Sequence, residues 1–476
     1  MTASGVFAAL MLSCSLLSSQ EAKPSVPAAE IRKLLDQGDP NAALELARKT
    51  AAAGDDSAPL HELLGEIAFR RGDIATAETE FKKALRMDGN LAMGWLGLGR
   101  VFRAASMYKS ARISFAKARS LDPANPEIDY AWTTTLQGAA RVEAYQARFE
   151  WAQHGGDPAA IDASRAALER EKLFAKHKLF HLTSGDAQAS IAFVLLLDGP
   201  KRLRGFGLPV SVNGAKPVTL LLDTGASGIL INRKAAERAG LTKIMDTKFG
   251  GIGDSGERTG YLALADHVRV GAVEFQDCPV DVSDRKSVAD EDGLIGTDVF
   301  SHFLVVLDFE KHVMRLEPLP DRPAEAGARA DAPADRFIAP EMKSYAPVFR
   351  FGHQLMIPTR VSGSPPMLFV IDTGATDALI SPAAAKLVTK VHGEEYVTMK
   401  GVSGKVNNVY RADQAVLEFA GFRQKNLDMI SIDLGGISKS TGTEVSGFLG
   451  LPVLTYFTLS IDYRDGLVQF EYHAPR

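Results

Sequence analysis

Cysteine is nearly absent from this chain of 476 residues, which contains only Cys14 and Cys278. This excludes a disulfide scaffold, and because no Cys-x-x-Cys pair or Cys/His cluster occurs, we expect no metal site. Charge of one sign is also missing: 54 Lys and Arg face 58 Asp and Glu, a net charge of −4. The sequence therefore gives no reason to expect nucleic acid or an acidic membrane surface as a partner.

Long hydrophobic runs are lacking as well. The N-terminal run SGVFAALMLSCSLLSS (4–19) is too short for a membrane span but has the length of a signal-peptide core, followed by the polar QEAKPS. We predict that residues 1–24 are a signal segment and that the protein is exported, to the periplasm or as a secreted protein. The box MLSC leaves lipid anchoring open. The alternatives are an unstructured leader of a cytosolic protein or a misassigned start, because no Lys or Arg precedes the run. If the leader is removed, Cys278 is a lone thiol, which we interpret as a buried strand residue.

Two segments of the first third repeat each other at a shift of 34 residues, 61–88 and 95–122. Gly65 maps to Gly99 and Phe81 to Phe115, so small residues allow helices to approach while phenylalanines fill the space between them. This period and pattern resemble tetratricopeptide repeats. Weaker copies on both sides, and a closing helix that begins with Asp157 and Pro158, extend the predicted all-α repeat domain over residues 28–180.

From about residue 187 the helical period gives way to short Val, Ile, Leu and Phe runs separated by Gly, Asp and Asn, which predicts β structure. The stretch EPLPDRPAEAGARADAPADRFIAP (317–340) is rich in Pro, Ala and charge and has no period. We therefore predict a first β lobe at 187–318, a linker at 319–342 and a second β lobe at 343–476. The length of the chain also favours two or three domains.

The two predicted lobes share a series of motifs. LLLDTGASGILI (220–231) matches FVIDTGATDALI (369–380), and GLIG (293–296) matches GFLG (447–450). Asp308 follows Gly296 by 12 residues, and Asp462 follows Gly450 by the same 12. The shared spacing indicates a duplicated unit and not a chance match of one tetrapeptide.

Each copy ends an apolar strand with one aspartate, Asp223 or Asp372, which is costly to bury as an anion unless hydrogen bonds compensate. A single copy supplies neither a nucleophile nor a general acid. Two carboxyl groups a few ångström apart cannot both ionise and share a proton, so one can act as a base on water while the other hydrogen-bonds a carbonyl. We therefore predict that both aspartates meet in one site.

The DTGA motif between an apolar strand and a short helix, followed by a glycine-rich turn and by hydrophobic–hydrophobic–Gly, resembles the retropepsin-like aspartic peptidase unit. The chain carries two such units, as the two-lobed pepsin-like enzymes do, and the residues after each motif are most similar to bacterial retropepsin-like proteins. The resemblance implies an all-β bilobal aspartic-protease fold and an aspartic-type endopeptidase that needs no cofactor and is active as a monomer. It implies that Asp223 and Asp372 are the catalytic pair, supported in their loops by Thr224, Gly225, Thr373 and Gly374.

The resemblance also implies that the glycine-rich turns KFGGIGDSGERTG and MKGVSGKVNN are flaps that close over an extended peptide. The flap residues would be Gly250, Gly251, Gly253, Gly401 and Gly404. The first turn departs from the pepsin pattern because it has no tyrosine; Tyr261 lies just beyond it. The substrate would be a polypeptide, and the helical repeats would recruit substrate or a protein partner.

Two other functions remain open at this stage. The chain could be a non-catalytic scaffold that binds peptides in its repeat groove, although the presence of both aspartates argues against this. The protease could also act on its own leader or on the Ala/Pro-rich stretch 317–340.

Overall fold

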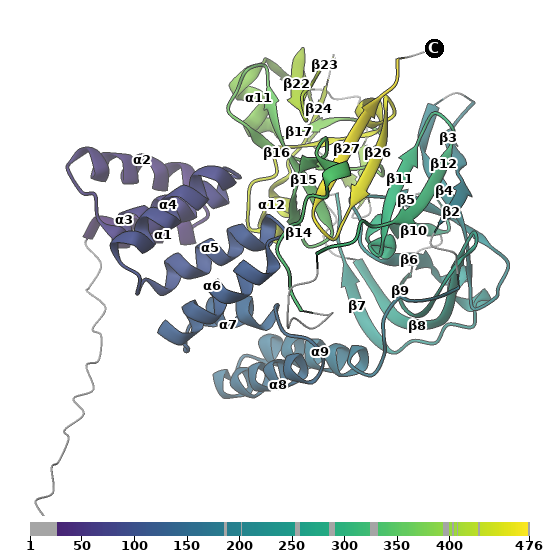
Figure 1. Cartoon of the computed structure of the whole chain (residues 1–476), viewed down its shortest axis with the longest axis horizontal. Helices are drawn as coiled ribbons and strands as arrows, with labels where there is room; N and C mark the ends of the chain where they lie inside the picture. The colour runs from purple at the N-terminus through teal and green to yellow at the C-terminus, as the bar shows by residue number, and fades with distance from the viewer. Residues whose placement is uncertain are drawn as a thin grey trace, which may run out of the picture.

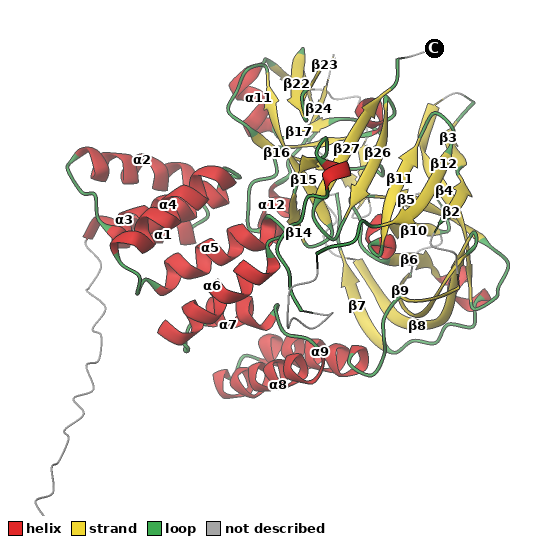
Figure 2. Cartoon of the chain, in the orientation of Figure 1, coloured by secondary structure: helices red, strands yellow, loops and turns green. Residues whose placement is uncertain are grey.

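The computed structural model describes residues 26–184, 188–200, 202–252, 258–284, 291–323, 332–393, 399–401, 404–406, 408–426 and 429–474. Helices gather in the N-terminal third and strands in the remainder (Figures 1 and 2). This confirms the predicted fold class, an all-α repeat followed by a β-rich region of two lobes. Among these residues no helix is both long and apolar enough to cross a membrane. The predicted signal segment, 1–24, lies outside the described residues.

The repeat region is a series of antiparallel helical hairpins with a closing helix. The helices are α1 (Val26–Asp36), α2 (Pro40–Ala52), α3 (Ala58–Arg70), α4 (Ile74–Met87), α5 (Ala92–Ala104), α6 (Tyr108–Leu121), α7 (Pro126–Thr133), α8 (Gly138–Gly155) and α9 (Pro158–Phe174). Several of these helices begin with an N-cap side chain that accepts a backbone hydrogen bond; Ser57 caps α3 and Asp73 caps α4. The predicted start of the closing helix is confirmed, with Asp157 as N-cap and Pro158 at the first turn of α9.

Glycine and phenylalanine set the spacing between repeat helices. Phe81 and Phe115 are fully buried. A Cβ atom on Gly65 would lie 2.7 Å from the Phe81 ring, and one on Gly99 would lie 2.5 Å from the Phe115 ring. The helices can approach this closely only because these positions have no side chain, as the repeat pattern predicts.

The first lobe is built on one sheet in the order β1-β9-β6-β10-β5-β4-β8-β7, with β3 beside β4. Its strands are β1 (His181–Ser184), β3 (Val194–Asp198), β4 (Arg202–Val212), β5 (Val218–Asp223), β6 (Ile229–Asn232), β7 (Met245–Phe249), β8 (Arg258–Val270), β9 (Val273–Ser283) and β10 (Gly293–Gly296). Helix α10 (Arg233–Arg238) follows β6, at the place of the short helix expected after the DTGA motif.

The second lobe repeats this plan in the order β18-β21-β24-β17-β25-β16-β15-β22-β23, with β14 beside β15. Its strands are β14 (Phe349–Phe351), β15 (Gln354–Val361), β16 (Met367–Ile371), β17 (Leu379–Ile380), β18 (Val391–Gly393), β21 (Tyr410–Ala412), β22 (Ala415–Phe419), β23 (Phe422–Asn426), β24 (Met429–Ser431) and β25 (Gly447–Leu449). Strands β19 (Met399–Gly401) and β20 (Gly404–Val406) form a separate hairpin. The helices are α11 (Pro382–Val388), α12 (Gly435–Thr441) and α13 (Leu451–Leu454).

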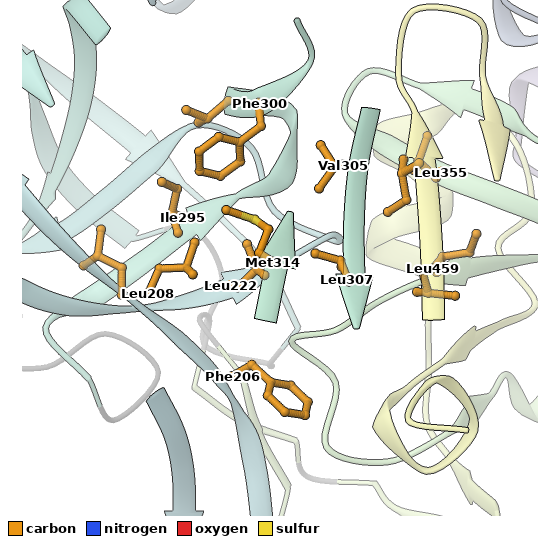
Figure 3. Packing of buried hydrophobic residues seen from close by; sticks show 14 of the residues in the cluster. Phe206, Leu208, Leu222, Ile295, Phe300, Val305, Leu307, Met314, Leu355 and Leu459 are labelled. Atoms are coloured by element: carbon orange, nitrogen blue, oxygen red, sulfur yellow. The ribbon is translucent and has the colours of Figure 1, made fainter. Parts of the chain in front are cut away.

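A third sheet joins the lobes in the order β13-β27-β26-β11-β12-β2. Its strands are β2 (Ala189–Ala192), β11 (Phe303–Asp308), β12 (Val313–Pro318), β13 (Ala346–Pro347), β26 (Phe457–Asp462) and β27 (Leu467–Tyr472). The closing hairpins of the lobes meet here, since β11 pairs antiparallel with β26 and Val306 faces Ser460. One apolar core runs through this junction, with Val305 and Leu307 of the first lobe beside Leu355 and Leu459 of the second (Figure 3).

The repeats are packed against the second lobe and are not held at a distance by a tether. Phe69 of α3 lies in one buried cluster with three residues of the second lobe, Leu368, Val445 and Phe448. The centroids of the Phe69 and Phe351 rings are 6.1 Å apart. Two hydrogen bonds cross the same contact: the Thr443 hydroxyl donates to the Phe69 carbonyl (2.6 Å), and the Glu444 N–H donates to the Arg70 carbonyl (2.8 Å). The repeat region and the second lobe therefore share a core.

The second half of the predicted linker is packed as well. Within residues 332–342, Ala339 and Met342 are buried. The Phe337 N–H donates to the buried carboxylate of Asp465 (2.7 Å), and the Arg336 guanidinium donates to the Asp465 carbonyl (2.7 Å). This segment is therefore a strap fixed to the junction between the lobes. Residues 324–331, which belong to the Ala/Pro-rich stretch proposed above for self-cleavage, lie outside the described residues.

Candidate active site

The two aspartates end corresponding strands and face each other across the lobes. Asp223 is the last residue of β5, and Asp372 directly follows β16. In each lobe a central strand lies parallel to the aspartate strand, β10 beside β5 and β25 beside β16. The two aspartate strands, β5 and β16, are mostly apolar and buried, so the sheet and the core fix their ends. Asp372 is buried at 7% exposure, and Asp223 is half-buried.

Reciprocal hydrogen bonds of the two threonines lock the loops together. The Thr224 hydroxyl donates to the Ile371 carbonyl (2.7 Å) and accepts from the Thr373 N–H (2.9 Å). The Thr373 hydroxyl donates to the Leu222 carbonyl (2.9 Å) and accepts from the Thr224 N–H (3.1 Å). Both threonines are buried, so each hydroxyl satisfies two backbone groups that water cannot reach.

The glycines after the threonines allow the carboxyl groups to come close. A Cβ atom on Gly374 would lie 2.5 Å from the Asp223 carboxyl carbon, and one on Gly225 would lie 2.8 Å from that of Asp372. Each carboxylate also accepts a backbone hydrogen bond in its own loop, from the Gly225 N–H to Asp223 and from the Gly374 N–H to Asp372, both 2.8 Å. The structure thus brings all six loop residues of the prediction to one place.

The electrostatics of the pair favour one shared proton. A hydrogen bond joins the two carboxyl side chains. Burial raises the pKa of Asp372 well above its usual range, and the neighbouring charge of Asp223 raises it further. Burial also raises the pKa of Asp223, but the Gly225 N–H and the hydrogen bond to Asp372 act in the opposite direction. Both shifts have burial as their largest cause, so the two carboxyl groups hold one proton between them and titrate as a pair.

The hydrophobic–hydrophobic–Gly motifs lie behind the aspartates. Gly296 is opposite Asp223 in the β10–β5 register, and its N–H donates to the Gly228 carbonyl (2.8 Å). In the second lobe, the Asp372 N–H donates to the Leu449 carbonyl (3.0 Å). Asp298, which belongs to none of the repeated motifs, accepts from the Ser227 hydroxyl (2.7 Å) and the Gly228 N–H (2.9 Å) and so fixes the end of the first loop.

The predicted flaps correspond to two β hairpins. Gly250 and Gly251 follow β7, which pairs with β8, and the neighbouring Ile252 packs against the cluster shared by the second lobe and the repeats. Gly401 and Gly404 pair with each other in the β19–β20 hairpin. Gly253 lies outside the described residues. The first hairpin therefore reaches from its own lobe to the other.

Sequence reasoning missed a histidine at the site. His353 lies in the turn between β14 and β15, and its Nε2 is 3.0 Å from the Gly225 carbonyl oxygen. Because a carbonyl only accepts, Nε2 carries the hydrogen in this contact. The two residues are 128 positions apart, so no local pattern in the sequence could have connected them.

Other groups that the sequence raised lie away from the aspartates. Cys278 is fully buried in β9, as predicted, and burial raises the pKa of its thiol to about 12. Within the described residues no group of three or more His, Cys, Asp or Glu could hold a metal ion. A cavity of about 480 Å³ lies between the junction sheet and the strap; Leu304, Met342 and Tyr345 line it, and neither aspartate does.

The doubled unit, with two Asp-Thr-Gly loops joined by threonine hydrogen bonds, defines the bilobal aspartic-peptidase fold. Comparison with protein families agrees. A family model described as aspartyl protease matches residues 208–299 and 357–453, one match in each lobe. A tetratricopeptide repeat model matches residues 29–92 and 70–126. The chain therefore contains a doubled, retropepsin-like aspartyl protease domain behind tetratricopeptide repeats.

Individual relatives match only a part of the chain. DNA damage-inducible protein 1 of Neurospora crassa is 31% identical over 113 residues, 23% of this chain and 24% of the relative. The UBA domain-containing protein Mud1 of Schizosaccharomyces pombe is 28% identical over 111 residues, 22% of this chain and 31% of the relative. The chain thus spans only about a quarter to a third of the length of these relatives. Among solved structures, the match to the Arabidopsis OM64 TPR domain spans 23% of this chain and 91% of that domain, at 18% identity and a TM-score of 0.22.

Proposed function

We propose that the chain is an aspartic endopeptidase in which Asp223 and Asp372 together activate one water molecule. The observation that carries the proposal is the hydrogen bond between the two carboxyl groups, in loops locked by Thr224 and Thr373. With one proton between them, the pair can hold a base and an acid in the same site.

The proposed reaction follows from the ionisation of the pair. Ionised Asp223 removes a proton from the water while its oxygen attacks the peptide carbonyl carbon. Protonated Asp372 donates its proton to the carbonyl oxygen as the C–O bond forms, which gives the tetrahedral diol. Asp223 then passes the proton it took from water to the amide nitrogen, and the C–N bond breaks. One diol hydroxyl returns its proton to Asp372, so the products are an amine and a carboxylic acid and the pair again holds a single proton.

We further propose that the substrate is an extended polypeptide, held by strand-like backbone pairing near the β7–β8 and β19–β20 hairpins. Repeats of this kind commonly bind proteins, so we assign a recruiting role to their free surfaces. Export of the protein, based on residues 1–24, remains part of the proposal, as does activity as a monomer. Processing of an N-terminal segment on secretion, read from the N-terminal sequence of the mature protein, tests the export.

The function is tested with unfolded protein substrates between pH 4 and 7, comparing the wild type with Asp372→Asn. Mass spectrometry of the products should identify cleavage at internal peptide bonds by the wild type only. A wild type that binds the substrates but leaves them intact would favour the alternative, a non-catalytic peptide-binding scaffold. Equal cleavage by both proteins would reject the mechanism.

A further inference from the structure

The two aspartate loops are nearly symmetric, and their hydrogen bonds alone do not decide which carboxyl group is ionised. Each aspartate accepts from the glycine two residues on at the same 2.8 Å, and each threonine makes the same pair of contacts across the lobes. The proposed reaction nevertheless needs one base and one acid. A group outside the loops must therefore favour one assignment over the other.

His353 is a point at which the symmetry breaks. The strand pairs β4–β5 and β15–β16 superimpose at a shift of 149, since Leu208 faces Leu220 and Ile357 faces Phe369. The same shift makes Arg204 the counterpart of His353. The Arg204 guanidinium is bonded to Glu291 of its own lobe, whereas His353 binds the Gly225 carbonyl of the opposite lobe. Corresponding positions thus carry different chemistry.

We infer that His353 is a positioning residue of the proposed peptidase, which holds the Asp223 loop from the opposite lobe and favours ionised Asp223 over ionised Asp372. The inference rests on the proposed function. Its geometric basis is the contact between His353 Nε2 and the carbonyl oxygen of Gly225, two residues after Asp223. This contact fixes the peptide plane that directly follows the catalytic motif.

The turn that carries His353 is itself held in place. Gly352 provides the left-handed backbone of the turn (φ 67°), and Phe351 packs against Phe69 of the repeats. Arg350 donates to the Tyr108 hydroxyl of α6 (3.0 Å) and to the Tyr463 carbonyl. The imidazole is therefore positioned by a turn that the repeats cover, which connects the repeat domain to the catalytic loop.

The charge of the imidazole acts in the same direction as the hydrogen bond. The Asp223 carboxylate is close enough to interact with its charge. On the same hairpin, the Arg350 guanidinium donates to the Tyr108 hydroxyl and to the carbonyls of Tyr463 and Gly352. Burial has the largest effect on the pKa of Asp223 and raises it, whereas the Gly225 N–H, the hydrogen bond to Asp372 and the charge of His353 all lower it. The proton of the pair then lies on Asp372, where the proposed mechanism needs it.

The test compares His353→Gln and His353→Ala with the wild type, Asp372→Asn and the control His473→Gln, which alters a histidine bonded to Thr458 near the C-terminus. Gln keeps an N–H donor without the charge. We expect His353→Ala to lower kcat about 10- to 100-fold with little change in KM, and His353→Gln to recover most of that loss. In both, the acid limb of the kcat/KM profile should move up by about 1 pH unit, because Asp223 has lost a neighbouring cation.

The outcomes separate the inference from the function on which it rests. An inactive wild type, or cleavage by Asp372→Asn, contradicts the proposed function. If the wild type cleaves and Asp372→Asn does not, the proposed function stands. If His353→Ala then matches the wild type in kcat and pH profile, only the role of His353 is overturned. A loss in His353→Ala that Gln does not recover, with an unmoved acid limb, overturns it as well, because a purely structural role predicts that result.

Discussion

The shared core between the repeats and the second lobe is tested by Phe69→Ala. Phe69 is 3% exposed and lies in the cluster that joins α3 to the second lobe, where it packs against the Phe351 ring. The central carbon of the Arg100 guanidinium lies 4.5 Å from the centroid of the Phe69 ring. Removing a buried phenylalanine typically costs about 3–5 kcal/mol, including the cavity that is left. Because each 1.4 kcal/mol changes an equilibrium constant tenfold, the equilibrium constant for opening of the contact between the repeats and the second lobe should rise more than about 100-fold in Phe69→Ala.

Hydrogen exchange measures this opening directly. The Glu444 N–H donates to the Arg70 carbonyl and exchanges only when the contact opens. The matched control is Ile31→Ala, which removes a fully buried residue from the cluster formed by α1, α2 and α3 alone. We expect Phe69→Ala to accelerate exchange at residues 443–449 and Ile31→Ala to leave it near the wild-type rate. Unchanged exchange in Phe69→Ala, or equal acceleration in both, would refute the shared core.

Three further predictions concern the site and the junction. Thr373→Val leaves the Thr224 N–H and the Leu222 carbonyl unpaired, so it should lower the free energy of unfolding, measured by urea denaturation, by about 2–4 kcal/mol. Thr373→Ser keeps the hydroxyl and should stay near the wild type; equal free energies for the two variants would contradict this. Gly374→Ala pushes a Cβ into the Asp223 carboxyl and should abolish cleavage, whereas Gly436→Ala, with open space around it, should not; an active Gly374→Ala argues against the geometry. Burial raises the pKa of Asp462 to about 6, above its unfolded value, so the stability that the protonated carboxyl group contributes is present at acid pH and lost as the pH rises through about 6. Asp462→Asn should therefore raise the free energy of unfolding at pH 7.5 by roughly 2 kcal/mol and flatten the dependence of that free energy on pH. An unaltered pH dependence in Asp462→Asn would contradict this prediction.

Much of the architecture could be predicted because it is written in local patterns. The 34-residue period located the repeats, and the doubled DTG and Gly motifs with equal 12-residue spacings located the two lobes. Side-chain capping by Asp157 and the buried position of Cys278 followed from their neighbours in the sequence. In each case the physical cause acts between residues that are close in the chain or repeated along it.

Other features depend on contacts between distant segments, which a single sequence does not encode visibly. The pairing of β11 with β26 is selected by packing across 154 positions, from Val306 to Ser460. Phe69 looks like any repeat-core residue until Phe351 is placed beside it. The composition of 319–342 is that of a linker, yet the buried carboxylate of Asp465 binds part of it as a strap. The role of His353 is of the same kind.

The central claim is that the two aspartates act as one unit, so that neither works alone. The most direct test measures kcat/KM of Asp223→Asn, Asp372→Asn and the double variant on one peptide substrate. The account predicts that each single change lowers the rate by about as much as both together, several orders of magnitude, because residues that act as a unit are strongly non-additive. Single variants that retain partial activity, with losses that multiply in the double variant, would contradict it.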